Sequence, residues 1–204
     1  MRTIKKGSRG DDVKTLQMAL NLLPDGIFGP LTEEAVKEFQ RKYGLVADGI
    51  VGPLTWALLP DASVVKKSKR SSNKIIVHCT ATREGKHFTV DDVRRWHIKE
   101  RGWSDIGYHY LVYLDGSIHA GRDVNISGAH TAGYNTHSIG VCYVGGLDAN
   151  GKPKDTRTDA QKAALLKLIK ELRSLYPKAT IHGHYEFANK ACPCFKPKEE
   201  YKGI

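Results

Sequence analysis

The sequence lacks a long apolar run. Nowhere in its 204 residues does one approach the ~18–20 residues that a membrane helix needs, so we expect no membrane insertion. The first residues, MRTIKKGSRGDD, carry positive charge without the apolar segment of a secretory signal. We therefore expect synthesis in the cytoplasm, and a target outside the cell would require a separate means of release.

Cysteine is scarce, with four residues in the chain. Four are too few for a disulfide framework at this length. In a reducing cytoplasm they are more typical of core positions or metal ligands. Cys79 and Cys142 lie in apolar, strand-like runs, IIVHC and IGVCYV, and we predict that both are simply buried.

Acidic residues are outnumbered, 22 against 32 lysines and arginines, which leaves a net charge of +10. Residues 1–61 are balanced, whereas residues 62–74 carry five basic residues and no acid. Such an excess attracts polyanions at long range. Nucleic acid and an anionic cell wall both fit, a solvated linker is the alternative, and charge alone does not decide between them.

Residues 182–195, HGHYEFANKACPCF, concentrate side chains that bind metals. Zinc prefers imidazole nitrogen and thiolate sulfur, and a catalytic zinc takes three protein ligands with one open position. His182 or His184, with Cys192 or Cys194, can supply two of these ligands, and the third must come from elsewhere. A polar loop without metal is the alternative, because His-x-His and Cys-x-Cys are only moderately specific.

The N-terminal part contains an internal repeat, in which DGIFGPLT at residues 25–32 recurs as DGIVGPLT at residues 48–55. Asp-Gly is turn chemistry and threonine is a favourable N-cap, so each copy predicts a turn followed by a helix start. The stripe after Thr32 predicts a helix ending near Gly44. An earlier helix, capped within residues 8–11, is predicted from the apolar stripe Val13, Leu16, Leu20 and Leu23. Residues 1–61 thus form a predicted all-α three-helix domain, followed by a basic linker at residues 62–73.

Residues 74–204 alternate strand and helix patterns. Strands are predicted at residues 74–79, 108–114, 117–120, 138–144 and 180–182. Capping boxes at Thr89–Asp92 and Thr158–Gln161 open two helices, the second with a long leucine-rich stripe that ends before Pro177. The pattern predicts an α/β domain, a mixed sheet flanked by helices, that is long enough to bury a full core.

Two resemblances add function to this outline. Residues 5–60, with their paired DG-x-x-G-x-x-T turns, resemble the peptidoglycan-binding domain of wall hydrolases. Residues 74–195 carry IIVHCTAT, GWSDIGYHYLVYLDGSIHAGRD, GAHTAGYN, HSIGVCYVGG and ACPCF in order. These resemble N-acetylmuramoyl-L-alanine amidases of the phage-lysozyme type, whose fold is shared with the peptidoglycan recognition proteins.

The second resemblance implies a set of site residues. It implies Zn²⁺ held by His78, His184 and Cys192, with Tyr108 and Lys190 near the metal as catalytic groups. His182 is then structural or supports a ligand, and Cys194 is a neighbour of the site or an alternative ligand. Glu186 is a weaker candidate for proton transfer. Strand alternation turns His109 away from Tyr108, so His109 is left out of the site.

His130 and Asn135 lie in the loop that matches the family's substrate groove, which implies contacts with wall sugar or peptide. The resemblance implies a phage endolysin, or else a bacterial autolysin, that acts as a monomer on peptidoglycan after release by a holin or by lysis. A recognition protein that binds the wall without cleaving it is one alternative, and Cys192 argues against it. A regulator that binds nucleic acid is another, but no nucleic-acid-binding fold is indicated.

Overall fold

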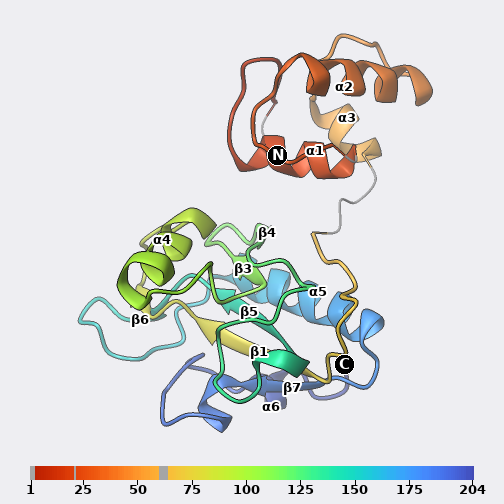
Figure 1. Cartoon of the computed structure of the whole chain (residues 1–204). Coiled ribbons are helices and arrows are strands. Elements are labelled where there is room, and N and C mark those ends of the chain that lie inside the picture. Colours follow the sequence, from red (N-terminus) through yellow and green to blue (C-terminus); the bar gives the residue numbers. More distant parts are fainter. Residues whose placement is uncertain (1–2, 21, 60–63) are drawn as a thin grey trace. The chain divides into compact units, whose positions relative to one another are not determined.

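The computed structural model describes residues 3–20, 22–59 and 64–204. The chain divides into two compact units, Met1–Val64 and Val65–Ile204 (Figure 1). The outermost residues of the predicted N-terminal domain (1–2 and 60–61) and the first two of the predicted linker (62–63) lie outside the described residues. Within the described part of the chain, no helix is both long and apolar enough to cross a bilayer.

Unit 1 contains the three predicted helices, α1 (Asp11–Ala19), α2 (Pro30–Lys42) and α3 (Pro53–Leu58). One small core combines Val13 and Leu16 of α1 and Val36 of α2 with residues of the connecting segments, Ile4, Phe28 and Val51, and Trp56 of α3 packs against it. Tyr43 and Gly44 follow the end of α2, as the sequence predicts, and Gly44 adopts the left-handed conformation that suits a helix terminus.

The predicted helix starts are wrong in detail. Helices α2 and α3 begin at Pro30 and Pro53, because proline has the helical φ already and lacks an N–H that would be unsatisfied there. Thr32 and Thr55 lie inside the helices and are buried. The N-cap of α1 is Gly10, which provides no side-chain hydrogen bond, so the predicted cap within residues 8–11 is not formed by a side chain. Leu23 lies beyond the end of α1 and is exposed.

A buried glutamine explains which residues recur in the two copies of the repeat. Gln17 Nε2 donates to Asp25 Oδ1 at 2.7 Å, to the Ile27 carbonyl at 3.1 Å and to Thr32 Oγ1 at 3.1 Å. Its Oε1 accepts from the Gly26 N–H at 2.9 Å. The second copy forms the same bonds from Gln40 to Asp48, Gly49, Ile50 and Thr55. The repeat is therefore a hydrogen-bonded unit in which one amide ties a turn to two helices.

Gln40→Met is expected to destabilise unit 1 by about 2–4 kcal/mol, because it leaves a buried N–H, a carbonyl and a hydroxyl without their partner. Hydrogen exchange of the full chain, followed in peptides from residues 9–59, measures the loss of protection. Glu38→Met is the matched control, since Glu38 is exposed on the same helix. Equal protection in both variants would show that the glutamine unit does not stabilise the module.

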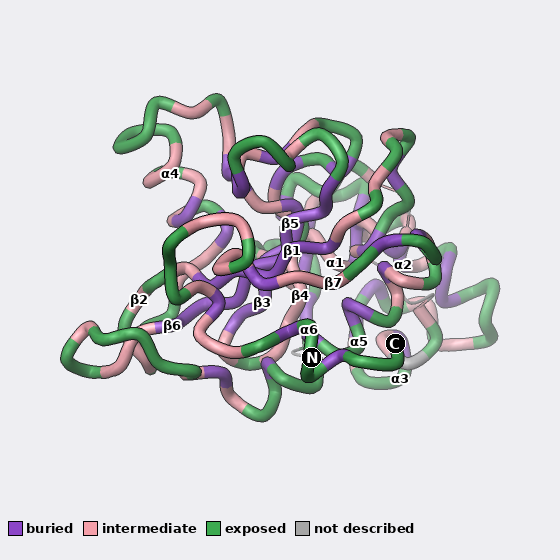
Figure 2. The backbone as a smooth tube through the Cα atoms, turned by 90° about the horizontal axis from the view of Figure 1, so that it is seen from below, coloured by how far each residue is buried: buried purple, intermediate pink, exposed green. Residues whose placement is uncertain are grey.

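Unit 2 is built on a five-stranded mixed sheet in the order β4-β3-β5-β1-β7. Strands β1 (Lys74–Cys79), β3 (Tyr110–Val112), β5 (Ser138–Tyr143) and β7 (Thr180–Gly183) are parallel, and β4 (Ile118–Ala120) pairs antiparallel with β3. The predicted strands at residues 108–114 and 117–120 are shorter in the structure. A separate two-stranded sheet pairs β2 (Thr82–Arg83) with β6 (Gly146–Leu147). The central strands are almost wholly buried (Figure 2).

Helices α4 (Val90–Arg101), α5 (Asp159–Leu175) and α6 (Pro197–Glu200) accompany this sheet, with short 3₁₀ turns η1 (Asn135–His137) and η2 (His184–Glu186). Both predicted capping boxes are present, at Thr89 and Thr158. The leucine stripe of α5 is buried, and α5 packs against β3. Cys79 and Cys142 are buried, as predicted. The predicted α/β fold with a small helical N-terminal domain is confirmed.

Residues 65–73, which the sequence assigns to the linker, are held along unit 2. The Lys66 N–H donates to the Tyr110 hydroxyl at 3.2 Å, and the Ser68 N–H donates to the Tyr176 hydroxyl. The Arg70 guanidinium donates to the carbonyls of Val124 at 2.9 Å and of Thr136 at 2.7 Å. This part of the basic stretch therefore belongs structurally to unit 2.

Candidate metal centre

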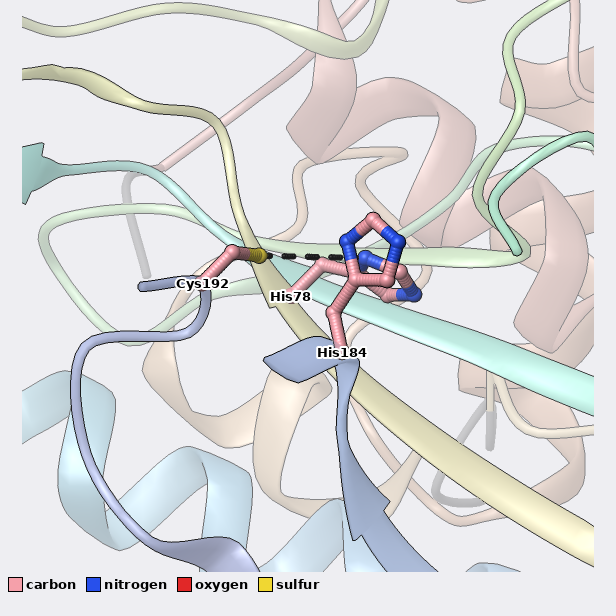
Figure 3. Close-up of side chains that lie close together, drawn as sticks. All are labelled: His78, His184 and Cys192. Atoms are coloured by element: carbon pink, nitrogen blue, oxygen red, sulfur yellow. Dashed lines mark hydrogen bonds between the residues drawn. The ribbon is translucent and has the colours of Figure 1, made fainter. Parts of the chain in front are cut away.

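Three ligand-type side chains meet where two parallel strands end. His78 lies near the end of β1, and His184 directly follows β7. Val77 and Gly183 are partners in the parallel register, so the two histidines continue adjacent strands side by side. Cys192 comes from the loop after η2. Ligand atoms of the three residues all lie within 4.8 Å of one another, and their side chains converge (Figure 3).

Three hydrogen bonds hold the Cys192 loop against β1, β5 and η2. The Tyr185 N–H donates to the Cys192 carbonyl at 2.8 Å, and the Cys79 N–H donates to Cys192 Sγ at 3.3 Å. The Tyr143 hydroxyl, from β5, donates to the Pro193 carbonyl at 2.7 Å. These bonds hold the sulfur 3.8 Å from His78 Nδ1. A tetrahedral zinc separates a nitrogen and a sulfur ligand by about 3.6 Å, so the observed spacing suits zinc.

A chain of hydrogen bonds sets which nitrogen of His78 faces Cys192. The Ser138 hydroxyl donates its single proton to the Tyr134 carbonyl at 2.8 Å, so it accepts from His130 Nε2 at 3.3 Å. His130 Nδ1 is then an acceptor, 3.1 Å from His78 Nε2 and 3.1 Å from the Thr131 hydroxyl. His78 therefore carries its proton on Nε2, and its Nδ1 lone pair is free to bind a metal.

His130 occupies a closely fitted position behind His78. A Cβ on Gly128 or Gly140 would lie 2.4 or 2.5 Å from His130 Cδ2, so only glycine leaves room for the ring. His130 is buried, and its imidazole faces His78. Asn135 Oδ1 accepts from the N–H groups of His130 and Thr131 at 2.9 and 2.8 Å, which folds the loop. His130 thus contacts a member of the metal group, and Asn135 folds the loop that carries His130. The predicted contacts of both residues with substrate stay a prediction.

The protonation of the three ligands suits metal binding. Burial, reinforced by the charges of His130 and His184, holds the pKa of His78 well below its usual value. Burial and the Lys190 charge also lower the pKa of His184. A hydrogen bond with the Cys79 side chain lowers the pKa of the Cys192 thiol, against the effect of burial. Neutral imidazoles and a stabilised thiolate are the forms that coordinate zinc.

Of the two predicted catalytic groups, Tyr108 contacts the metal group, and Lys190 acts on it through its charge. Tyr108 lies in the loop just before β3, and its ring centroid is 5.2 Å from that of His78. Burial raises the pKa of Tyr108, so the phenol keeps its proton and can donate it in a hydrogen bond. Lys190 is exposed in the loop between His184 and Cys192, and its charge contributes to the lowered pKa of both histidines in the group.

The other candidate residues have structural partners. His182 Nδ1 pairs with Glu186 Oε2 at 2.9 Å, and Glu186 Oε1 accepts from the Gly183 N–H at 2.9 Å, which braces the turn before His184. Cys194 Sγ donates to the Gly146 carbonyl at 3.1 Å. His109 Nδ1 accepts from the Gly140 N–H at 2.9 Å. None of His182, Glu186, Cys194 and His109 belongs to the three-residue metal group found among the described residues.

Sequence reasoning missed the groups that position His78. Ser138, Gly128, Gly140 and the backbone of Tyr134 act through tertiary contacts, and each taken alone is an ordinary strand or loop residue. The signal that could have found them is the pair of motifs GAHTAGYN and HSIG, in which glycines flank a buried histidine and its serine partner.

Comparison with known families agrees with both units. Residues 9–59 match a family described as a putative peptidoglycan binding domain. Residues 68–195 match the family of N-acetylmuramoyl-L-alanine amidases. The second match covers the whole metal group and the residues that support it.

Individual relatives support the match of unit 2 to this amidase family. The endolysin of Enterobacteria phage K11 is 45% identical over 134 residues, which is 66% of this chain and 88% of the relative. Among solved structures, the Ph2119 endolysin from a Thermus scotoductus bacteriophage is 31% identical and superposes with a TM-score of 0.54, over 64% of this chain and 82% of that one. Drosophila PGRP-LB is 26% identical with a TM-score of 0.56, over 68% and 84%.

Proposed function

Because the chain belongs to the N-acetylmuramoyl-L-alanine amidase family and carries an N-terminal peptidoglycan-binding domain, we propose that it cleaves peptidoglycan between the muramic acid lactyl group and the first L-alanine of the stem peptide. The observation that carries the proposal is the convergence of His78, His184 and Cys192 from two adjacent strand ends and one pinned loop.

His78, His184 and Cys192 are the residues that would hold zinc, which when bound supplies Lewis acidity and lowers the pKa of water to about 7. The protein's own groups complete the site. The Lys190 ammonium stabilises negative charge that develops on the carbonyl oxygen of the scissile amide. The Tyr108 phenol donates a hydrogen bond to the attacking water or to the tetrahedral intermediate. The effect of the Lys190 charge on the pKa of both histidines supports the first role, and the Tyr108 ring beside His78 supports the second.

Phage endolysins among the relatives support a biological setting. The protein acts in host lysis, and it reaches the wall after release by a holin or by lysis. A recognition protein that binds the wall without cleaving it is the alternative. The complete set of two histidines and a cysteine favours catalysis, since a wall-binding role needs no thiolate ligand.

End-group analysis of purified peptidoglycan tests the proposal. After digestion by the full chain, we expect new L-alanine amino termini without new reducing sugars. New reducing ends would mean glycosidase activity and would contradict the roles given to the metal group. Tight wall binding with bound zinc and no new ends would assign the chain to the recognition class.

His130→Phe is expected to weaken zinc binding about 10- to 100-fold, because His78 loses the acceptor that holds its ring and its proton. Competition with a chelator measures the zinc dissociation constant independently of activity. His137→Gln, an exposed histidine two residues beyond Asn135, is the matched control. Unchanged zinc affinity in folded His130→Phe protein would show that His130 does not position His78.

A further inference from the structure

Unit 1 exposes large apolar side chains at equivalent positions of its two repeats. Leu23 and Val46 are each 81% exposed, Ile27 and Ile50 are 42% and 38% exposed, and Leu31 and Leu54 are 83% and 73% exposed. Each pair is separated by the same 23 residues as the repeat itself. Isolated exposed apolar residues are ordinary, but three matched pairs on one small module are not.

The scaffold does not require these side chains. The hydrogen-bonded unit uses Gln, Asp, Gly and Thr, and the prolines start the helices. Other positions that are at least partly exposed have diverged between the copies, such as Thr15 against Glu38 and Met18 against Arg41. Leucine is nevertheless identical in both copies at Leu31 and Leu54, where it packs little, and isoleucine is identical at the partly exposed Ile27 and Ile50. Their retention therefore indicates a function outside the fold.

Both copies present these groups from the same rigid backbone. The Ile27 N–H donates to Asp25 Oδ1 at 2.8 Å, and the Ile50 N–H donates to Asp48 Oδ1 at 2.8 Å. The carbonyls of the two isoleucines accept from the buried glutamines of their repeats. Leu31 and Leu54 each follow directly the proline that begins a helix, α2 and α3 respectively. The two turns are thus preorganised, and little ordering is required on binding.

We infer that these turns form two equivalent contact sites for peptidoglycan, one made by Leu23, Ile27 and Leu31 and the other by Val46, Ile50 and Leu54. Aliphatic side chains suit the methyl groups that peptidoglycan carries on its N-acetyl, lactyl and alanine units. A polymer repeats these groups, so a single wall strand offers ligands to both sites and the two contacts reinforce each other. The inference rests on the proposed function, because it takes the wall as the ligand of unit 1.

Leu31→Gln, Leu54→Gln and the double variant test the inference in the full chain, by co-sedimentation with purified wall sacculi on ice. Glutamine is tolerated in a helix, and both positions are exposed, so folding is preserved. We expect each single variant to bind about three- to tenfold more weakly and the double variant about ten- to a hundredfold more weakly. Ile98→Gln, which removes an apolar residue that is 42% exposed on α4, is the control and should bind normally.

Hydrolysis of a soluble muropeptide, measured on the same proteins, separates this inference from the proposed function. Selective loss of wall binding with an unchanged soluble rate supports the contact sites. Selective loss of binding in a protein that never cleaves the muropeptide also supports them, and refutes only the amidase proposal. Wild-type binding by the double variant overturns the inference, as does an equal loss of binding and soluble rate, which would mean that the leucines act through unit 2.

Discussion

Cys192→Ser is expected to abolish most hydrolysis, by more than about a hundredfold, through loss of the metal. A serine hydroxyl does not ionise near neutral pH and is a poor ligand for zinc, whereas the structure favours the Cys192 thiolate. The substitution is nearly isosteric and leaves the backbone bonds of the loop in place. Zinc content and the release of L-alanine amino termini should therefore fall together.

Cys194→Ser is the matched control for this experiment. Cys194 lies two residues further along the same loop, donates to the Gly146 carbonyl and stands outside the metal group. Its variant should keep both zinc and activity, and loss of zinc there would assign the thiolate ligand to Cys194 instead. Full activity in zinc-free Cys192→Ser protein would refute the metal mechanism altogether.

Lys190→Ala is expected to lower the rate of hydrolysis by about 10²- to 10³-fold while the protein keeps its zinc. The side chain is exposed, so its removal should not disturb the fold, and its charge acts near the histidine ligands. Lys190 is not one of the three metal ligands, so its removal takes away a positive charge but no atom that would bind zinc. Rate measurements on a soluble muropeptide, with zinc content determined in parallel, separate charge stabilisation from metal binding.

Two further variants sharpen the result for Lys190. Lys198→Ala removes an exposed lysine from α6, eight residues along the chain, and should leave the rate unchanged. Lys190→Arg keeps the positive charge and should recover part of the lost rate. A Lys190→Ala protein with a normal rate, or one that has lost its zinc, would remove Lys190 from the proposed catalytic role.

Local sequence signals predicted much of the fold correctly. The capping boxes at Thr89 and Thr158 combine with apolar periodicity, and both helices begin where predicted. Strand β1 was predictable because a continuous apolar run has few alternatives. The prediction that Thr32 and Thr55 cap helices was wrong. A threonine after a turn can cap a helix or accept a hydrogen bond from a distant glutamine, and only the folded module shows which of the two occurs.

For the candidate site too, the sequence predicted part and left the rest open. From the residues alone, His182 or His184 and Cys192 or Cys194 were open choices, and only the resemblance to a family selected among them. In the structure, His184 follows the partner of Val77, so it continues beside His78, while His182 turns to Glu186. That selection depends on the register of two strands about a hundred residues apart, which no local pattern encodes.

The sequence by itself determined the two-part organisation, the long helices and the strands of the main sheet, the buried cysteines and, through its motifs, the family. Those features depend on periodicity, capping and motif chemistry, which act within a few residues. Tertiary structure alone decided that His130 contacts His78, that Ser138 sets the tautomer, and that residues 65–73 belong to unit 2. These outcomes depend on hydrogen bonds between groups distant in the chain, because a buried polar atom takes whichever partner the fold brings to it.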